Sequence, residues 1–294
     1  MTFKRVVFVA DYFVENYLGG SEKSLDAIIR VAPSGLHIVK VLSEVFNPGE
    51  FQPKKDFIVL GNYNRVPIQF LEDVSARFKF AVIESDFKIC RYRLPEMHNV
   101  GSEKCECATD PRQEYVRNLF RKSKVNFFKS QRHMDRHLSM LPFLKEHRNV
   151  VLSVTYTPED LAFLLKLRYE RKPFSKTFPW DKPVYGIYDS DNWIKGKTDA
   201  IEYCKKNDLK YVLIREDDDV SFQRKLATCH GFVFMPRGME SASRITVEAK
   251  IIGLDLRINE NASVGGDAFM SGTIQEIISF LKERPKLFWE EIDR

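Results

Sequence analysis

Residues 231–253 read Gly-Phe-Val-Phe-Met-Pro-Arg-Gly-Met-Glu-Ser-Ala-Ser-Arg-Ile-Thr-Val-Glu-Ala-Lys-Ile-Ile-Gly, which predicts a buried strand, a loop and a helix that ends at a glycine. Ile245, Ala249 and Ile252 share one helical face, so this helix can cover a sheet. A helix start after a strand offers backbone N–H groups and a positive dipole end, which suit an anion such as a diphosphate. Glu240 before the helix and Glu248 inside it add acceptors for sugar hydroxyls.

Short apolar runs alternate with helical patterns along the rest of the chain. Runs such as Val-Val-Phe-Val-Ala at 6–10 are typical of strands buried on both faces of a sheet. The expected strands are Arg5–Ala10, His37–Leu42, Asp56–Leu60, Phe80–Ile83, Val125–Phe128, Val150–Val154, Val184–Tyr188, Tyr211–Ile214, Phe232–Met235 and Leu254–Ile258. The expected helices are Glu22–Ile29, Gln113–Phe120, Glu159–Leu167, Thr198–Lys206, Phe222–Cys229, Ser243–Ile252 and Thr273–Leu281.

Residues 172–183 interrupt this alternation with three prolines in a basic, aromatic stretch. We interpret this stretch as a linker between one domain at 1–171 and another at 184–294. Strand–helix alternation on both sides predicts an α/β fold with two parallel-sheet domains. Ligands of such folds bind at the carboxyl ends of the strands, so we expect a site in the cleft that the two domains face.

The composition is that of a soluble globular protein, with 44% hydrophobic and 30% charged residues among 294. A net charge of +5 permits binding to nucleic acid without demanding it. No apolar run is long enough to span a bilayer, and the first ten residues are too strand-like for a secretion signal. We therefore expect a cytoplasmic protein without a transmembrane segment. No residue pattern indicates an oligomeric state.

The five cysteines are an odd number, which argues against a disulfide framework. Three thiols and an imidazole lie close together in the sequence, at Cys90, His98, Cys105 and Cys107. They could close a tetrahedral zinc site, but the paired Cys-x-x-Cys spacing is absent. Reduced thiols in a loop are therefore the favoured interpretation, with zinc as the alternative.

The other histidines show no spacing typical of a metal site. His133 and His137 lie four residues apart without a following acidic partner, so we interpret them as surface residues.

The motif Pro236-x-x-x-Glu240, followed by Arg244, Glu248-Ala249, Gly253 and Asn259, resembles the donor site of retaining glycosyltransferases with the GT-B fold. The resemblance implies that Glu240 lies beside the donor sugar and that Glu248 accepts hydrogen bonds from the ribose of the nucleotide. It also implies that the loop of Ser241, Ala242 and Ser243 offers backbone N–H groups. The spacing alone is equally compatible with an ordinary i,i+4 surface ion pair between Arg244 and Glu248.

The same resemblance assigns roles to the two domains. It implies two Rossmann-like domains facing a cleft, the first on the acceptor side and the second binding the nucleotide-sugar. It further implies that the last helix, at Thr273–Leu281 and extended by Phe288-Trp289, crosses back to the first domain.

Two further segments match donor-binding parts of this family. Gly19-Gly20 precedes a helix after the first strand, where the backbone can approach the diphosphate closely. Lys195-Gly196 matches the place of a basic pair on the diphosphate, but Tyr188-Asp189 stands where an arginine is expected. The diphosphate clamp is then weakened, or the missing charge is left to Lys197 or Arg237.

The acceptor side is expected at the end of the fourth strand, where Asp86 can orient an acceptor hydroxyl. Some enzymes of the family carry a histidine before this aspartate, and Ser85 replaces it here. Lys88, Arg91 and Arg93 follow and could meet phosphates, although solvated charge is the commoner outcome.

The resemblance implies a glycosyltransferase that moves a sugar from a UDP- or GDP-sugar to a glycan or small hydroxyl acceptor with retention. The expected catalytic residues are Glu240, Lys195 and Asp86. No metal and no further cofactor are expected at this site, because backbone amides and Lys195 can neutralise the leaving diphosphate. Two alternatives stay open: a sugar transferase that modifies a hydroxylated base in DNA, and a non-catalytic interaction protein that has kept a nucleotide-sugar fold.

Overall fold

The computed structural model describes residues 3–100, 104–171, 183–216 and 218–294. It contains two sheets of parallel strands, one with six strands and one with four. The chain forms two compact units, of which the first is Met1–Thr157 with Leu281–Arg294 and the second is Pro158–Phe280. Within the described ranges, no helix has both the length and the apolar character needed to cross a bilayer.

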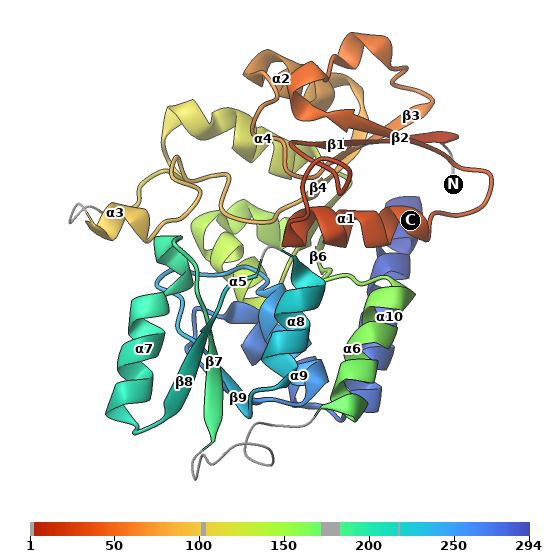
Figure 1. Cartoon of the computed structure of the whole chain (residues 1–294). Helices are drawn as coiled ribbons and strands as arrows, with labels where there is room; N and C mark the ends of the chain where they lie inside the picture. The colour runs from red at the N-terminus through yellow and green to blue at the C-terminus, as the bar shows by residue number, and fades with distance from the viewer. Residues whose placement is uncertain (1–2, 101–103, 172–182, 217) are drawn as a thin grey trace. The chain divides into compact units, whose positions relative to one another are not determined.

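The first unit is built on a parallel sheet with strand order β2-β1-β3-β4-β5-β6 (Figure 1). Its strands are β1 (Arg5–Ala10), β2 (His37–Leu42), β3 (Asp56–Leu60), β4 (Lys79–Ile83), β5 (Val125–Phe128) and β6 (Asn149–Val151). Its helices are α1 (Gly20–Arg30), α2 (Ile68–Arg77), α3 (Met97–Val100), α4 (Glu114–Lys122) and α5 (Gln131–Met140).

Alternate residues of β1 enter two different apolar layers, because successive side chains of a strand point to opposite faces. Val7 and Val9 pack with side chains of α2 and α4. Val6 and Phe8 pack with α1 and with the last turns of α10 (Ile274–Asp293). Residues 6–10 are at most 1% exposed, so β1 is covered on both faces, as its continuous apolar run predicts.

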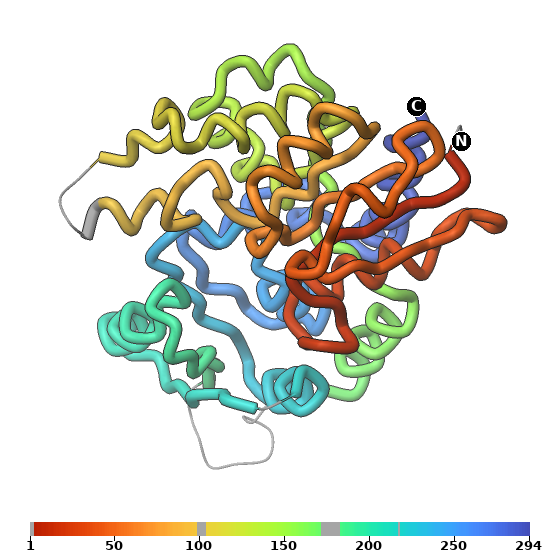
Figure 2. The backbone as a smooth tube through the Cα atoms, turned by 90° about the horizontal axis from the view of Figure 1, so that it is seen from above, coloured from red at the N-terminus to blue at the C-terminus, as the bar shows by residue number. Residues whose placement is uncertain are grey.

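The last turns of α10 complete the core of the first unit. In Figures 1 and 2 this blue segment lies beside the red N-terminal part of the chain. The Phe288 ring lies 4.9 Å from that of Phe127 and 6.0 Å from that of Phe8. Trp289 Nε1 donates to the carbonyl oxygen of Ile28 at 2.8 Å. Residues from the two ends of the sequence therefore share one apolar layer.

The second unit is built on a smaller parallel sheet with strand order β10-β9-β7-β8. Its strands are β7 (Val184–Tyr188), β8 (Lys210–Ile214), β9 (Gly231–Phe234) and β10 (Asp255–Ile258). Its helices are α6 (Pro158–Glu170), α7 (Lys197–Lys206), α8 (Asp219–Ala227), α9 (Arg244–Ile252) and the first turns of α10. Figure 1 shows α7 on one side of these strands and α8 with α9 on the other.

Helix α6 belongs to the second unit, whereas the sequence analysis places it in the first domain. Arg168 Nη1 donates to the carbonyl oxygen of Ile251 at 3.0 Å, and Arg171 donates to that of Gly253. The end of α6 thereby satisfies carbonyls that the end of α9 leaves without intrahelical partners. The change of unit falls between Thr157 and Pro158, and residues 172–182 of the expected linker lie outside the described residues.

Three α-helices have no counterpart among the expected elements: α2, α3 and α5. Helix α5 starts at Ser130, whose hydroxyl accepts from the His133 amide at 3.2 Å. The interpretation of His133 and His137 as surface residues is wrong, because both are fully buried. Their rings stand on one helical face and pack against Phe87 and Phe128. The histidines therefore take the place of the apolar stripe that would have indicated a helix.

We expect Phe288→Ala to destabilise the protein by about 3–5 kcal/mol, because it leaves a cavity in a fully buried layer. Denaturant unfolding, followed by tryptophan fluorescence, measures this change. Ile68→Ala removes an apolar side chain that is 49% exposed and serves as the control, with an expected change within about 0.5 kcal/mol. Equal stabilities of the two variants would contradict the role of α10 in this core.

Candidate active site

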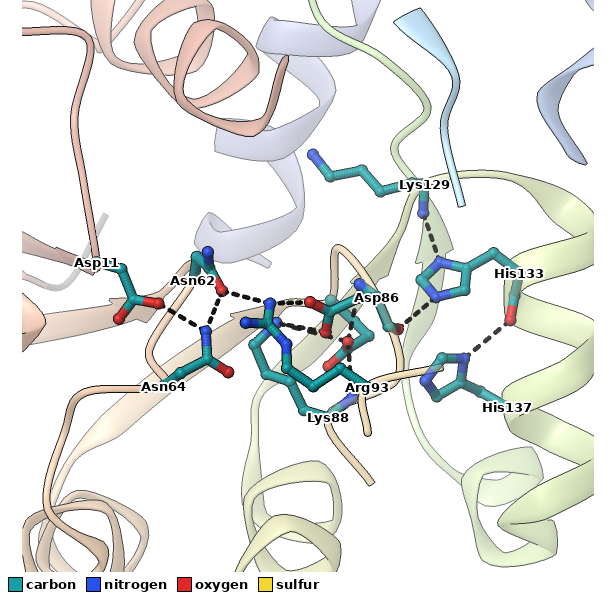
Figure 3. Close-up of polar contacts among 10 residues, drawn as sticks. Asp11, Asn62, Asn64, Asp86, Lys88, Arg93, Lys129, His133 and His137 are labelled. Atoms are coloured by element: carbon teal, nitrogen blue, oxygen red, sulfur yellow. Dashed lines mark hydrogen bonds and ion pairs between the residues drawn. The ribbon is translucent and has the colours of Figure 1, made fainter. Parts of the chain in front are cut away.

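Polar side chains gather at the carboxyl ends of the strands of the first sheet, the edge at which parallel sheets bind ligands. Asp11 follows β1, Asn62 follows β3, Glu84 and Asp86 follow β4, and Lys129 follows β5. Figure 3 shows most of these side chains in one network of hydrogen bonds and ion pairs. The sequence analysis named only Asp86 among them. The rule that sites lie at strand ends, applied to every strand in turn, identifies the others.

Asp86 is held in place from several sides. One carboxylate oxygen accepts from Lys88 Nζ at 3.1 Å, and the other pairs with Arg93 Nη2. Arg93 Nη2 also donates to Asn62 Oδ1 at 3.0 Å. The backbone carbonyl oxygen of Asp86 accepts from His133 Nε2 at 2.7 Å. The Asp86 side chain is 24% exposed, so solvent still reaches a carboxylate with lone pairs to spare.

The same contacts determine which of the basic residues after β4 are paired with carboxylates. Lys88 is buried and lies 3.6 Å from Glu84 as well as beside Asp86. Arg93 adopts a positive φ of 57° and pairs with Asp86. Arg91 stands over the Tyr92 ring at 4.8 Å and is exposed. Two of the three cations are thus neutralised by carboxylates of their own loop and form no track for phosphates.

A second polar group lies beneath Asp86 and consists of Glu84, His133 and His137. Both nitrogens of His133 are used, because Nε2 donates to Asp86 and Nδ1 accepts from the Lys129 amide at 3.3 Å. His137 Nδ1 donates to the His133 carbonyl oxygen at 2.9 Å. His133 keeps no lone pair for a cation, so this group is a poor metal site.

Burial controls the protonation of the same group. Desolvation raises the pKa of Glu84, lowers the pKa of His133 well below its usual range and lowers the pKa of His137 to about 3. Both rings are therefore neutral at pH 7. Glu84 Oε1 accepts from the amides of Asp86 and Lys88, which bends the chain directly after β4.

Gly19-Gly20 lies at the start of α1, as the sequence analysis expects. A Cβ on Gly19 would lie 2.3 Å from Glu22 Oε2, so a larger residue there would displace the Glu22 side chain. Glu22 is buried in the first turn of α1, and desolvation raises its pKa. Glu22, Ser85 and Lys129 line a small cavity of about 10 Å³, which has room for roughly one water molecule. A sugar does not fit inside it.

In the second unit, the loops after β7 and β9 are fastened to each other. Arg237 N donates to the Ile194 carbonyl oxygen at 2.9 Å. Gly196 has a positive φ of 64°, and a Cβ there would lie 1.7 Å from the Met235 carbonyl oxygen. Only glycine permits this approach of the two loops. Lys195, the residue before it, is thereby fixed at the carboxyl ends of the strands.

The structure brings together Lys195 and Glu240, which the sequence analysis places on the diphosphate and beside the sugar. Lys195 Nζ lies 2.8 Å from Glu240 Oε2, and both side chains are partly buried. The Glu240 amide donates to the Asn261 carbonyl oxygen at 2.8 Å, and Ser263 Oγ donates to the carbonyl oxygen of Glu240. The glutamate thus has a fixed backbone and a side chain that meets a cation.

The other two candidate cations are also paired with carboxylates. Lys197 Nζ lies 2.7 Å from Asp189, and this hydrogen bond raises the pKa of Lys197. Arg237 pairs with Asp199 and stands over the Trp193 ring at 5.6 Å. Asp189 occupies the position of the expected arginine and draws Lys197 towards itself. Of the three candidate cations, Lys195 is therefore the one whose side chain contacts Glu240.

Glu248 forms the ion pair that the spacing permits, but the pair is not on the surface. Arg244 Nε donates to Glu248 Oε1 at 2.9 Å, and Arg244 Nη2 donates to Asp160 Oδ2 at 2.8 Å. The Glu248 side chain is only 6% exposed. Desolvation raises its pKa, while Arg244 and Gln223 act in the opposite direction. A buried, oriented carboxylate is a more specific feature than a solvated pair.

The turn of Ser241, Ala242 and Ser243 leads into α9. Ser243 is the N-cap residue, yet its hydroxyl accepts from Thr246 Oγ1 at 2.9 Å and makes no capping hydrogen bond. The carbonyl oxygen of Ser241 accepts from Ser263 Oγ at 3.0 Å. The turn is thus fixed through its carbonyl side, next to Glu240.

No protein-family model and no curated protein matches this sequence. Among solved structures, the catalytic domain of starch synthase IV from Arabidopsis thaliana, bound to ADP and acarbose, has a TM-score of 0.55 at 8% identity, over 99% of this chain and 100% of that chain. HepE from Anabaena, in complex with UDP and glucose, has a TM-score of 0.47 at 13% identity, over 98% of this chain and 95% of that chain.

Both neighbours are GT-B glycosyltransferases. The TM-score with HepE is below 0.5, so the fold assignment rests on the starch synthase domain. The α/β class with two parallel sheets and the GT-B fold, both expected from the sequence, are confirmed.

We expect His137→Phe to make the protein less sensitive to acid. Between pH 6.5 and about 3, the unfolded His137 binds a proton that the folded residue does not, so stability falls as the pH decreases through this window. Its contribution is at most about 1.4 kcal/mol per pH unit. Denaturant unfolding at pH 7 and pH 5 measures the difference, with exposed His37→Gln as the control. An unchanged pH slope in His137→Phe would contradict a buried neutral ring.

Proposed function

We propose that this protein is a glycosyltransferase that transfers a sugar from a nucleoside-diphosphate sugar to a hydroxyl acceptor. The observation that carries the proposal is the contact of Lys195 with Glu240, at 2.8 Å, at the carboxyl ends of the strands of the second sheet. A diphosphate attracts the ammonium group of Lys195, which leaves the Glu240 carboxylate to accept from a sugar hydroxyl. One ligand with an anionic and a polyol part satisfies both side chains.

The proposed donor is a UDP- or GDP-sugar. The starch synthase structure contains ADP, so a ligand with a diphosphate occurs on a protein of similar architecture. Glu248 is proposed to accept from the ribose, since a buried carboxylate gains most from a donor once water is excluded. The backbone amides of Ser241, Ala242 and Ser243, together with Gly19-Gly20, are proposed to face the phosphates.

Retention of the anomeric configuration is proposed from the seven residues between Glu240 and Glu248, the spacing of retaining enzymes that the motif resembles. Charge grows on the leaving diphosphate in the transition state, and Lys195 is placed to stabilise it. Asp86 is proposed to orient the acceptor hydroxyl, because Lys88 and Arg93 hold its carboxylate in one position.

A neutral acceptor, either a glycan or a small alcohol, is favoured over DNA. Lys88 and Arg93 are occupied by Asp86, so the basic residues after β4 offer little to a phosphate backbone. The non-catalytic alternative draws on Asp189, which stands in place of an arginine and binds Lys197.

Donor hydrolysis tests the proposal as a whole. The protein is first screened against a panel of nucleotide-sugars by thermal shift, because a ligand at one hundred times its Kd adds about 2.7 kcal/mol of stability. The donor that binds is then incubated with the protein in the absence of acceptor. Binding with slow release of the sugar supports the enzyme, whereas binding without any hydrolysis or transfer supports the non-catalytic alternative.

Glu248→Ala is expected to weaken nucleotide binding about ten- to a hundred-fold, because a charge-assisted hydrogen bond is worth about 1.5–3 kcal/mol. Calorimetric titration with the nucleoside diphosphate measures this loss. Glu202→Ala, an exposed glutamate of α7, is the matched control and should bind like the parent. Parent-like affinity in a folded Glu248→Ala would leave Glu248 as a purely structural partner of Arg244.

Lys195→Ala is expected to lower the rate of transfer about 10²–10³-fold and to change donor affinity less, because the charge it meets develops in the transition state. Lys197→Ala removes a cation that is paired with Asp189 and should cost less. Steady-state kinetics with the donor from the screen compare the two variants. A larger loss in Lys197→Ala would move the diphosphate contact from Lys195 to Lys197.

A further inference from the structure

The connection between β4 and α4 spans residues 84–113, and its described parts, 84–100 and 104–113, contain one short α-helix, α3. Connections of this length without secondary structure are uncommon in compact domains and need other means of fixation. Four potential metal ligands lie in this connection, and their ligand atoms lie within 4.8 Å of one another. They are Cys90, His98, Cys105 and Cys107.

Three of the distances between these atoms are close to the edges of a zinc tetrahedron. With Zn–S bonds of about 2.3 Å and Zn–N bonds of about 2.0–2.1 Å, a tetrahedron has S···S edges of about 3.8 Å and S···N edges of about 3.6 Å. Cys90 Sγ and Cys105 Sγ lie 3.8 Å apart. His98 Nε2 lies 3.4 Å from Cys90 Sγ and 3.4 Å from Cys107 Sγ.

The surroundings also fit a metal site. Cys90, His98 and Cys107 are at most 4% exposed, and Cys105 is partly exposed. None of the three cysteines is in a disulfide. His98 and Cys107 line a larger hollow that is open to solvent, which gives an ion a route of entry.

We propose that Cys90, His98, Cys105 and Cys107 bind one Zn²⁺ in tetrahedral coordination, and that the ion fastens the β4–α4 connection. A closed set of three thiolates and one imidazole is typical of structural zinc sites, which keep no position open for substrate. The zinc site is independent of the proposed glycosyl transfer. It leaves unchanged the expectation that no metal acts on the donor.

The contacts on either side of the ligands indicate what the ion stabilises. Cys90 N donates to the Phe87 carbonyl oxygen, and Arg93 N donates to that of Cys90, each at 2.7 Å. This turn carries Arg93 to Asp86. At the other end, Arg117 of α4 donates to the carbonyl oxygens of Ala108 and Asp110 at 2.8 and 3.0 Å. Zinc would therefore join the turn that holds Asp86 to the segment that docks on α4.

Metal analysis of the protein purified without chelator tests the site. We expect about one zinc per chain, since one closed set of ligands binds one ion. Cys105→Ser removes the partly exposed ligand, which the fold tolerates best, and should abolish stoichiometric zinc. Cys204→Ser and Cys229→Ser are matched controls, because these buried cysteines lie in the second unit, and both should keep the zinc.

Cobalt substitution counts the thiolates without any mutation. The zinc-free, reduced parent protein is titrated with Co²⁺, and a tetrahedral thiolate spectrum should saturate at one equivalent. Cys105→Ser should show no such saturation at one equivalent, because one of the four ligands is gone. Absence of this spectrum in the parent, or a Cys90–Cys105 disulfide found under non-reducing conditions in place of metal, would overturn the proposal. So would zinc that Cys105→Ser retains in full.

Thermal unfolding then tests the role of the ion. Removal of zinc with a chelator in the presence of reductant should lower the Tm of the parent to about that of Cys105→Ser, and should lower the Tm of Cys204→Ser by a similar amount. Cys105→Ser itself should not respond to the chelator. A parent protein that loses its zinc at unchanged Tm would contradict the fastening role.

Discussion

A carboxylate buried at the carboxyl end of β4 governs the arrangement of the first unit. Glu84 is fully buried, and a carboxylate removed from water must find hydrogen-bond donors or become protonated. Donors come from the amides of Asp86 and Lys88, which forces the chain to curl directly after the strand. The curl presents Asp86 to Arg93 and turns its carbonyl oxygen towards His133. Asp86 is thus positioned by groups that never need to meet a substrate.

The second unit uses paired charges in another way. Lys195, Lys197 and Arg237 each meet a carboxylate, so the loops after β7 and β9 hold their cations in place before any ligand arrives. A preorganised cation costs little reorganisation when an anion displaces its partner. The pairing with Glu240 differs from the other two, because Glu240 belongs to the motif that the sequence analysis connects with the sugar.

Local patterns in the sequence predict most strands, because runs buried on both faces, such as Val-Val-Phe-Val-Ala, have few other interpretations. The motif around Glu240 and Glu248 predicts the GT-B fold through its resemblance to a known donor site. Helix α5 was not predicted, because two neutral histidines take the place of an apolar face. Their neutrality follows from burial, which the sequence alone does not show. The contact of Arg93 with Asn62 joins residues far apart in the chain, and no local pattern encodes it. The sequence shows the four proposed zinc ligands, but only the structure shows that their side chains converge.

The division of α10 between the two units has a consequence for synthesis on the ribosome. Phe288 and Trp289 fill the layer formed by Phe8 and Ile28, so the unit that is translated first lacks part of its own interior until residues 281–294 have been synthesised. Domains that are continuous in sequence can fold in the order in which they emerge. Here the second unit, continuous from Pro158 to Phe280, can mature earlier than the one that precedes it. Until then, the N-terminal sheet has an uncovered apolar face. Such a face favours aggregation, against which chaperones protect.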